Sequence, residues 1–198
     1  MRAYERLLKY VSVYTTSDPN SATVPSSMRQ YDLANILVDE LKALGLENVH
    51  VDENGVVYGW LSATAGCEQK PALGFIAHLD TAPDCSGENV KPQITEHYDG
   101  GDVLLAGSGE TLSPAAFPGL KKLVGMTLIT TDGTTLLGAD DKAGIAEIMA
   151  AVETILEKDL PHGEVRVIFT TDEEIGNGVD GLDVQQLGCD YGYTVDGG

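Results

Sequence analysis

An amphipathic helix followed by two strands limits what the second half of this chain can fold into. Apolar side chains recur every three or four positions in residues 140–158 and predict a helix: Ile145, Ile148, Met149, Val152, Ile155 and Leu156. Pro161 ends this pattern, and the residues after it predict strands at 164–171 and 191–195. An apolar run at 72–77 predicts an earlier strand that is covered on both faces. This alternation indicates an α/β fold with a right-handed crossover.

The rest of the chain predicts shorter elements. Helical spacing predicts one helix in the first dozen residues and another at 33–44 that ends at Gly45, and two short strands are expected at 49–51 and 56–61. Loops are expected at 15–27, which is polar with two prolines, and at 82–125, which is irregular and long enough to be functional. Residues 126–131 and 134–137 predict a hairpin around Asp132-Gly133.

The charge balance restricts the partners of the chain. It has 31 Asp and Glu against 12 Lys and Arg, a net charge of −19. Nucleic acid and anionic membranes are disfavoured because phosphate binding needs a basic surface, and cations or cationic small molecules are favoured. The plain alternative is that the acidic surface serves solubility. The three cysteines have no C-x-x-C spacing, and no apolar run is long enough to cross a bilayer, so we expect free thiols and a cytoplasmic protein.

Polar residues follow each predicted central strand and begin the predicted helix. These residues are His78 and Asp80, then Asp172, Glu173 and Glu174, then Asp196, and the Asp140-Asp141 pair before the helix. In open α/β sheets, sites form beyond the carboxyl ends of strands, so we expect these side chains at one edge. Each motif alone has an ordinary explanation: a surface pair, a helix cap, an acidic turn. Their joint occurrence at four ends favours a site.

The residue types suit a catalytic metal. Histidine and carboxylates bind zinc, cobalt or manganese. In an extended chain His78 and Asp80 point the same way, so Asp80 can hold one imidazole nitrogen while the other binds metal. Glu173 and Glu174 diverge, so one can bind metal while its neighbour faces the substrate as a general base.

At these residues the chain resembles the family of co-catalytic zinc aminopeptidases and amidohydrolases, and within it the tripeptidase branch. The motifs are His78-x-Asp-Thr, Gly138-Ala-Asp-Asp-Lys-Ala-Gly, Asp172-Glu-Glu and Thr194-Val-Asp-Gly-Gly, with the longer run from His78 to Ile94. The resemblance covers nearly the whole chain. It implies a three-layer αβα fold around a sheet of largely parallel strands.

The resemblance also implies a role for each site residue. Two zinc ions would be held by His78 and Asp196 on one side and Glu174 on the other, with Asp140 bridging them; cobalt or manganese could substitute. Asp80 would orient His78, and Glu173 would be the general base. The peptide bond between Asp140 and Asp141 is expected to be cis.

The implied activity is release of the N-terminal residue from tripeptides. Family members are about twice as long, so residues 1–198 are expected to be the N-terminal portion of a catalytic domain without its lid domain and C-terminal part. A further histidine ligand would come from that part, because His50, His97 and His162 lie in segments without a ligand motif. We therefore expect this chain alone to be inactive or weakly active.

Other functions stay open at this point. The chain could be a different amidohydrolase or a dipeptidase of the same family. A magnesium-dependent phosphohydrolase would suit the acidic strand ends and Thr131-Asp132-Gly-Thr134, although it explains His78 poorly. A non-catalytic binding module is the alternative outside enzymes. The sequence determines neither the side-chain preference for peptides nor the oligomeric state.

Overall fold

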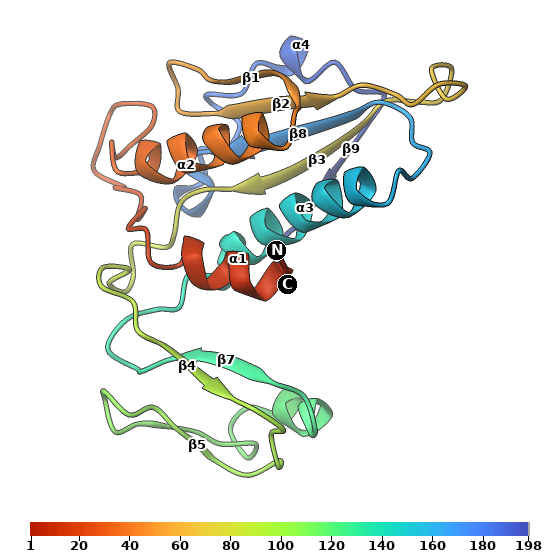
Figure 1. Ribbon diagram of the computed structural model, residues 1–198. Helices are drawn as coiled ribbons and strands as arrows, with labels where there is room; N and C mark the ends of the chain where they lie inside the picture. The colour runs from red at the N-terminus through yellow and green to blue at the C-terminus, as the bar shows by residue number, and fades with distance from the viewer. Residues whose placement is uncertain (198) are drawn as a thin grey trace. The chain divides into compact units, whose positions relative to one another are not determined.

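The computed structural model describes residues 1–197, which form two compact units (Figure 1). One unit combines Met1–Asp84 with the stretch that begins at Gly138, and the other is Cys85–Leu137. The predicted site residues all lie in the first unit.

A five-stranded sheet in the order β1-β2-β8-β3-β9 forms the centre of the first unit. Its strands are β1 (Glu47–Val51), β2 (Val57–Leu61), β8 (Val165–Thr170), β3 (Leu73–His78) and β9 (Tyr191–Thr194). β3 pairs in parallel with β8 and β9, whereas β2 pairs antiparallel with both β1 and β8. Among the described strands of this sheet, β2 therefore runs against the other four. The predicted α/β fold with a mainly parallel central sheet is confirmed.

Apolar side chains alternate between the two faces of the sheet, and different segments cover each face. One face packs under α1 (Ala3–Tyr10), α2 (Gln30–Ala43) and α3 (Ala139–Glu157), in a core that includes Leu37, Met149, Val167 and Phe169. On the other face Tyr58 and Ile168 pack against Leu182 and Leu187, which flank or belong to the short helix α4 (Val184–Leu187). The sheet is thus the middle of three layers, and the second outer layer is thin.

The register of the parallel strands brings their carboxyl ends together. His78 at the end of β3 pairs with Thr170 at the end of β8, and Ile76 pairs with Thr194 at the end of β9. Residues that follow these strands consequently meet at one edge of the sheet, where α3 also begins.

The second unit is built from short antiparallel pairs. β4 (Pro92–Thr95) pairs with β7 (Leu128–Thr131), β5 (Val103–Leu104) pairs with β6 (Thr111–Leu112), and a 3-10 helix, η1, spans Pro118–Leu123. Tyr98, Val103 and Leu128 form its small core. The irregular excursion predicted for residues 82–125 thus belongs largely to a unit with its own core.

The predicted hairpin of residues 126–131 and 134–137 is wrong. β7 pairs with β4 instead, and residues 134–137 form no strand. The Asp132 carboxylate accepts hydrogen bonds from the Thr134 backbone N–H (2.9 Å) and hydroxyl (2.6 Å). The Asp132 side chain thus satisfies the Thr134 backbone N–H within a local turn, without strand pairing.

Two further predictions concern membrane-spanning segments and cysteines. Among the described residues, no helix has the length and apolar character needed to cross a membrane. Cys67, Cys85 and Cys189 are all free thiols, as expected.

Candidate metal centre

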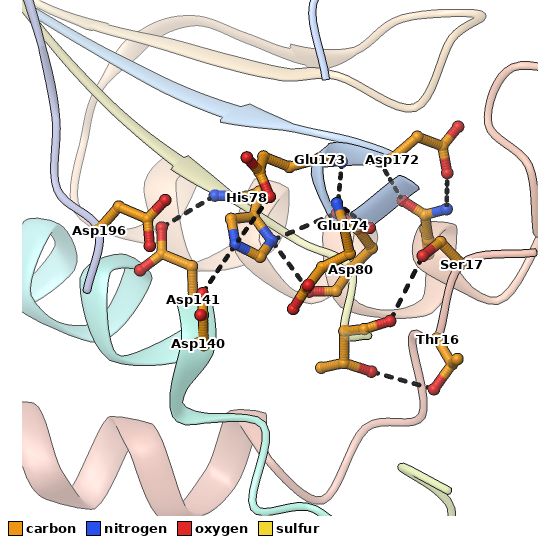
Figure 2. Close-up of polar contacts among 12 residues, drawn as sticks. Thr16, Ser17, His78, Asp80, Asp140, Asp141, Asp172, Glu173, Glu174 and Asp196 are labelled. Carbon is orange, nitrogen blue, oxygen red and sulfur yellow. Dashed lines mark hydrogen bonds and ion pairs between the residues drawn. The ribbon is translucent and has the colours of Figure 1, made fainter. Parts of the chain in front are cut away.

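The candidate metal centre lies at the carboxyl ends of three neighbouring strands (Figure 2). His78 ends β3, Glu173 and Glu174 begin the 3-10 turn η2 (Glu173–Ile175) after β8, and Asp196 follows β9. Asp140 and Asp141 come from the first turn of α3. The structure therefore brings together His78, Asp80, Asp140, Glu173, Glu174 and Asp196, whereas the Asp172 carboxylate bonds Ser26 and Gln30 instead.

The imidazole of His78 is buried and held at both ring nitrogens. Nδ1 lies 3.0 Å from the backbone oxygen of Asp80 and 3.3 Å from its carboxylate, and Nε2 lies 3.0 Å from Oδ1 of Asp140. Burial lowers the pKa of His78, but the hydrogen bond and charge of Asp80, with the charge of Asp141, outweigh this effect and raise it to about 9. Asp80 thus occupies one side of the ring, and Nε2 faces the carboxylates.

Asp141 anchors the start of α3 to β3. Its carboxylate accepts hydrogen bonds from the backbone N–H of His78 (3.1 Å) and of Gly144 (3.2 Å). Taken alone, the Asp140-Asp141 pair would be explained by Asp140 as the cap of the helix. In the structure Asp141 makes the capping contact. The side chain of Asp140 is 65% exposed. The bond between the two aspartates is cis, as the resemblance implies.

Two groups of potential ligands share His78. Oxygen and nitrogen atoms of His78, Asp140 and Glu174 lie within 4.8 Å of one another, and so do those of His78, Asp141 and Asp196. Neither described group contains both Asp140 and Asp196. Asp141, which the sequence treated as a neighbour rather than a ligand, therefore joins Asp196.

These residues fit a divalent metal ion. Burial and the charge of Asp140 raise the pKa of Glu174, and burial raises the pKa of Asp141 to about 7 with a further contribution from Asp196. Carboxylates crowded in this way repel one another, and a cation between them would relieve the repulsion. Imidazole and carboxylate donors together suit zinc, cobalt or manganese.

Asp80 has a second function that the sequence did not indicate. Its carboxylate is fully buried and accepts hydrogen bonds from the backbone N–H groups of Glu173 (3.0 Å) and Glu174 (3.1 Å). The same side chain therefore holds both the His78 ring and the backbone of the turn that carries the two glutamates.

Glu173 faces a cavity of about 330 Å³ beside the ligand groups. Its side chain is 53% exposed, and its carboxylate lies 3.9 Å from Nε2 of His78. Val179 and Leu182 add apolar surface to the lining, which also includes His78 and Asp196. This cavity has room for a small ligand next to an exposed carboxylate.

The remaining histidines join neither ligand group. His97 is exposed and His50 and His162 are half-buried, and none of them enters a ligand group within the described residues. The sequence assigned them no ligand role.

Residues 131–196 match the model of Peptidase family M20/M25/M40. The chain is 55% identical over its whole length to Peptidase T of Caldanaerobacter subterraneus subsp. tengcongensis, of which it covers 48%. It is 57% identical over 98% of its length to Peptidase T of Geobacillus thermodenitrificans, of which it covers 47%. The chain thus spans about half the length of these curated relatives.

Two solved peptidase structures also resemble this chain. The chain resembles the aminopeptidase PepT of Bacillus cereus with a TM-score of 0.69 and 26% identity, over 99% of this chain and 43% of that one. A tripeptidase of Staphylococcus aureus matches with a TM-score of 0.66 and 27% identity, over 99% and 43%. The resemblance inferred from the motifs is confirmed.

Proposed function

We propose that this chain, similar over its whole length to Peptidase T, supplies the metal ligands and the general base of an aminopeptidase that releases the N-terminal residue of tripeptides. The observation that carries the proposal is the pair of ligand groups that share His78 at the carboxyl ends of β3, β8 and β9.

In this proposal the site holds two zinc ions. His78 and Asp196 would hold the first ion, Glu174 would hold the second, and Asp140 would contribute its carboxylate to both. The two ligand groups support His78 with Asp196 and Asp140 with Glu174, and they add Asp141 as a carboxylate beside the first ion. The sharing of Asp140 between both ions is taken from the family resemblance. When bound, the metals supply Lewis-acid chemistry that polarises the scissile carbonyl and lowers the pKa of water.

The protein side chains supply proton transfer and orientation. Glu173, exposed at the cavity, accepts the proton of the attacking water and returns it to the leaving amine. Asp80 holds Nδ1 of His78 so that Nε2 is available to the metal. Its contacts with the glutamate turn keep Glu173 and Glu174 near the same imidazole.

The substrate class follows from charge and from the relatives. A net charge of −19 favours ligands with a free ammonium group, such as the N-terminus of a short peptide. A cytoplasmic location, based on composition and cysteine usage, remains our prediction. A dipeptidase or another amidohydrolase of the same family is the alternative on substrate, and comparison of dipeptide with tripeptide hydrolysis decides between them.

The magnesium-dependent phosphohydrolase is less well supported. Magnesium binds carboxylates and water and rarely imidazole, whereas His78 takes part in both ligand groups. Calorimetric titration with zinc and with magnesium separates the two proposals, because the peptidase requires tighter binding of zinc.

Variants test the assigned roles. His78→Ala and Glu174→Gln should each weaken zinc binding by about tenfold or more, as loss of a ligand or its support does. In the protein at its full natural length, Glu173→Gln should leave zinc affinity unchanged and lower tripeptide hydrolysis, measured with added zinc or cobalt, by about 100-fold or more.

Glu157→Gln, an exposed acid at the far end of α3, is the matched control and should change neither quantity. Equal zinc affinity in the His78, Glu174 and control variants would refute the proposed site.

A further inference from the structure

The polar segment before α2 is a buried part of the site's support. Residues 15–27 read as a loop from the sequence, and they contain no helix or extended strand. Thr15, Thr16, Ser17, Ser26 and Ser27 are nevertheless buried, as is Gln30 at the start of α2. Buried polar side chains need hydrogen-bond partners, and Ser26 and Gln30 find theirs at the residue before the two site glutamates.

That residue is Asp172, which is buried and forms no ion pair with another of the residues that the structure describes. The carboxylate accepts hydrogen bonds from the backbone N–H of Ser26 (2.7 Å), the hydroxyl of Ser26 (2.5 Å) and the side-chain amide of Gln30 (2.6 Å). The backbone of Asp172 is in the left-handed region, with φ of 60°, where a residue other than glycine is uncommon. The three donors compensate the buried charge and hold this conformation.

Gln30 also bonds the backbone of the same residue. Its amide oxygen accepts the N–H of Asp172 (3.2 Å), while its amide nitrogen donates to the carboxylate. The next two N–H groups, of Glu173 and Glu174, donate to Asp80. Three successive backbone N–H groups of this turn therefore end on two fully buried side chains, Gln30 and Asp80.

Within the part of the chain that the structure describes, the carboxylates of Glu173 and Glu174 form no hydrogen bonds. Glu173 is 53% exposed and its nearest ion-pair partner is His78 at 3.9 Å. Their positions thus depend mainly on the backbone of the turn. Asp80 is already part of the site, but Gln30 and Ser26 lie more than 140 residues from Asp172 in sequence. Among the described residues, their side chains form no hydrogen bond with a proposed metal ligand.

We propose that Gln30, assisted by Ser26, is a positioning residue that fixes the Glu173-Glu174 turn through Asp172 and thereby sets the zinc affinity of the site. The proposal extends the proposed function, because it takes Glu174 as a zinc ligand. The claim that Gln30 fixes the Glu173-Glu174 turn can be tested without any metal.

Gln30→Met tests the proposal with a side chain of similar size and shape that cannot donate a hydrogen bond and accepts one only weakly. Amide hydrogen exchange of Glu173 and Glu174, relative to the core strand β8, should accelerate by about tenfold or more, and zinc affinity in calorimetry should fall by a similar factor. The far-ultraviolet circular dichroism should be unchanged. Gln185→Met, at an exposed glutamine of α4, is the matched control and should change none of these quantities.

The outcomes separate this inference from the proposed function. Unchanged exchange at the turn in Gln30→Met would overturn the inference whatever the metal does. Faster exchange with unchanged zinc affinity would overturn it too, provided that Glu174→Gln weakens zinc binding. If Glu174→Gln also leaves zinc binding unchanged, the proposed function fails and the exchange result alone decides whether Gln30 holds the turn. If Gln30→Met does not fold, Ser26→Ala replaces it, because this change removes one hydroxyl donor to Asp172 and keeps the backbone donor.

Discussion

A methyl group at Gly144 would separate α3 from the segment that carries Asp196. Gly144 is buried near the start of α3, where an added Cβ would lie 2.0 Å from the backbone oxygen of Val195 and 2.4 Å from Oδ1 of Asp141. In an exposed helix, replacement of glycine by alanine stabilises by about 1 kcal/mol. Here we expect the sign to reverse.

The magnitude follows from the required displacement. Carbon and oxygen approach to about 3.3 Å without strain, so α3 and Val195 must move apart by more than about 1 Å. Val195 is held to Ile76 by a 2.8 Å backbone hydrogen bond, which resists this movement. Overpacking of this kind costs about 1–3 kcal/mol. Gly144→Ala should lower the free energy of unfolding by that amount, and it should weaken zinc binding because Asp196 moves with Val195.

Urea unfolding followed by circular dichroism measures the first effect, and calorimetric zinc titration measures the second. The control is Gly119→Ala in η1, where an added Cβ meets no heavy atom within 4 Å, and the free energy should change by less than about 0.5 kcal/mol. A Gly144→Ala variant as stable as the original chain would refute the close approach of α3 and Val195. Lower stability with unchanged zinc affinity would refute the link to Asp196.

Three further predictions concern buried charges. Arg6→Met and Glu40→Gln should each destabilise the chain, and the double variant should lose about 0.5–3 kcal/mol less than their sum in urea unfolding; additive losses would contradict this. The reason is that either single change removes the same direct contact, although Arg6 keeps its ion pair with Glu153 and Glu40 keeps its ion pair with Lys9. Burial raises the pKa of Glu40, but hydrogen bonds from Lys9 and Tyr10 and the charge of Arg6 hold it below its usual value. Glu40 therefore stabilises the chain above its unfolded pKa, and this contribution disappears as the pH falls through the folded pKa. Between about pH 5 and pH 3, the free energy of unfolding should fall less for Glu40→Gln than for the original chain. Parallel plots of unfolding free energy against pH for the two proteins would contradict this. Asp80→Asn should cost about 1–3 kcal/mol of unfolding free energy, because the amide cannot accept both backbone N–H groups of the glutamate turn; unchanged urea unfolding would contradict this.

Local patterns in the sequence were sufficient for the main elements. Apolar side chains on one stripe predicted the helix observed as α3, and apolar runs predicted β3 and β8 to within about one residue at each end. The rule that sites form beyond the carboxyl ends of parallel strands then placed His78, Glu173, Glu174 and Asp196 together. These predictions succeeded because the side-chain period of an element reports which face it buries.

Pairings between distant segments were decided only by the tertiary structure. β7 pairs with β4 rather than with the residues after Asp132, and local alternation cannot reveal which strand lies alongside. Asp141 caps α3 and joins Asp196, an arrangement that depends on how the first turn of the helix meets β3.

The hydrogen bonds that hold the Glu173-Glu174 turn are the clearest case of a pairing that only the tertiary structure decided. The sequence by itself determined that Glu173 and Glu174 follow a central strand and diverge. Only the fold brings Ser26 and Gln30 to Asp172, across a separation of 146 and 142 residues. A buried hydrogen bond of this kind leaves no periodic signal, because its donor and acceptor belong to different elements and meet only after both have packed on the sheet.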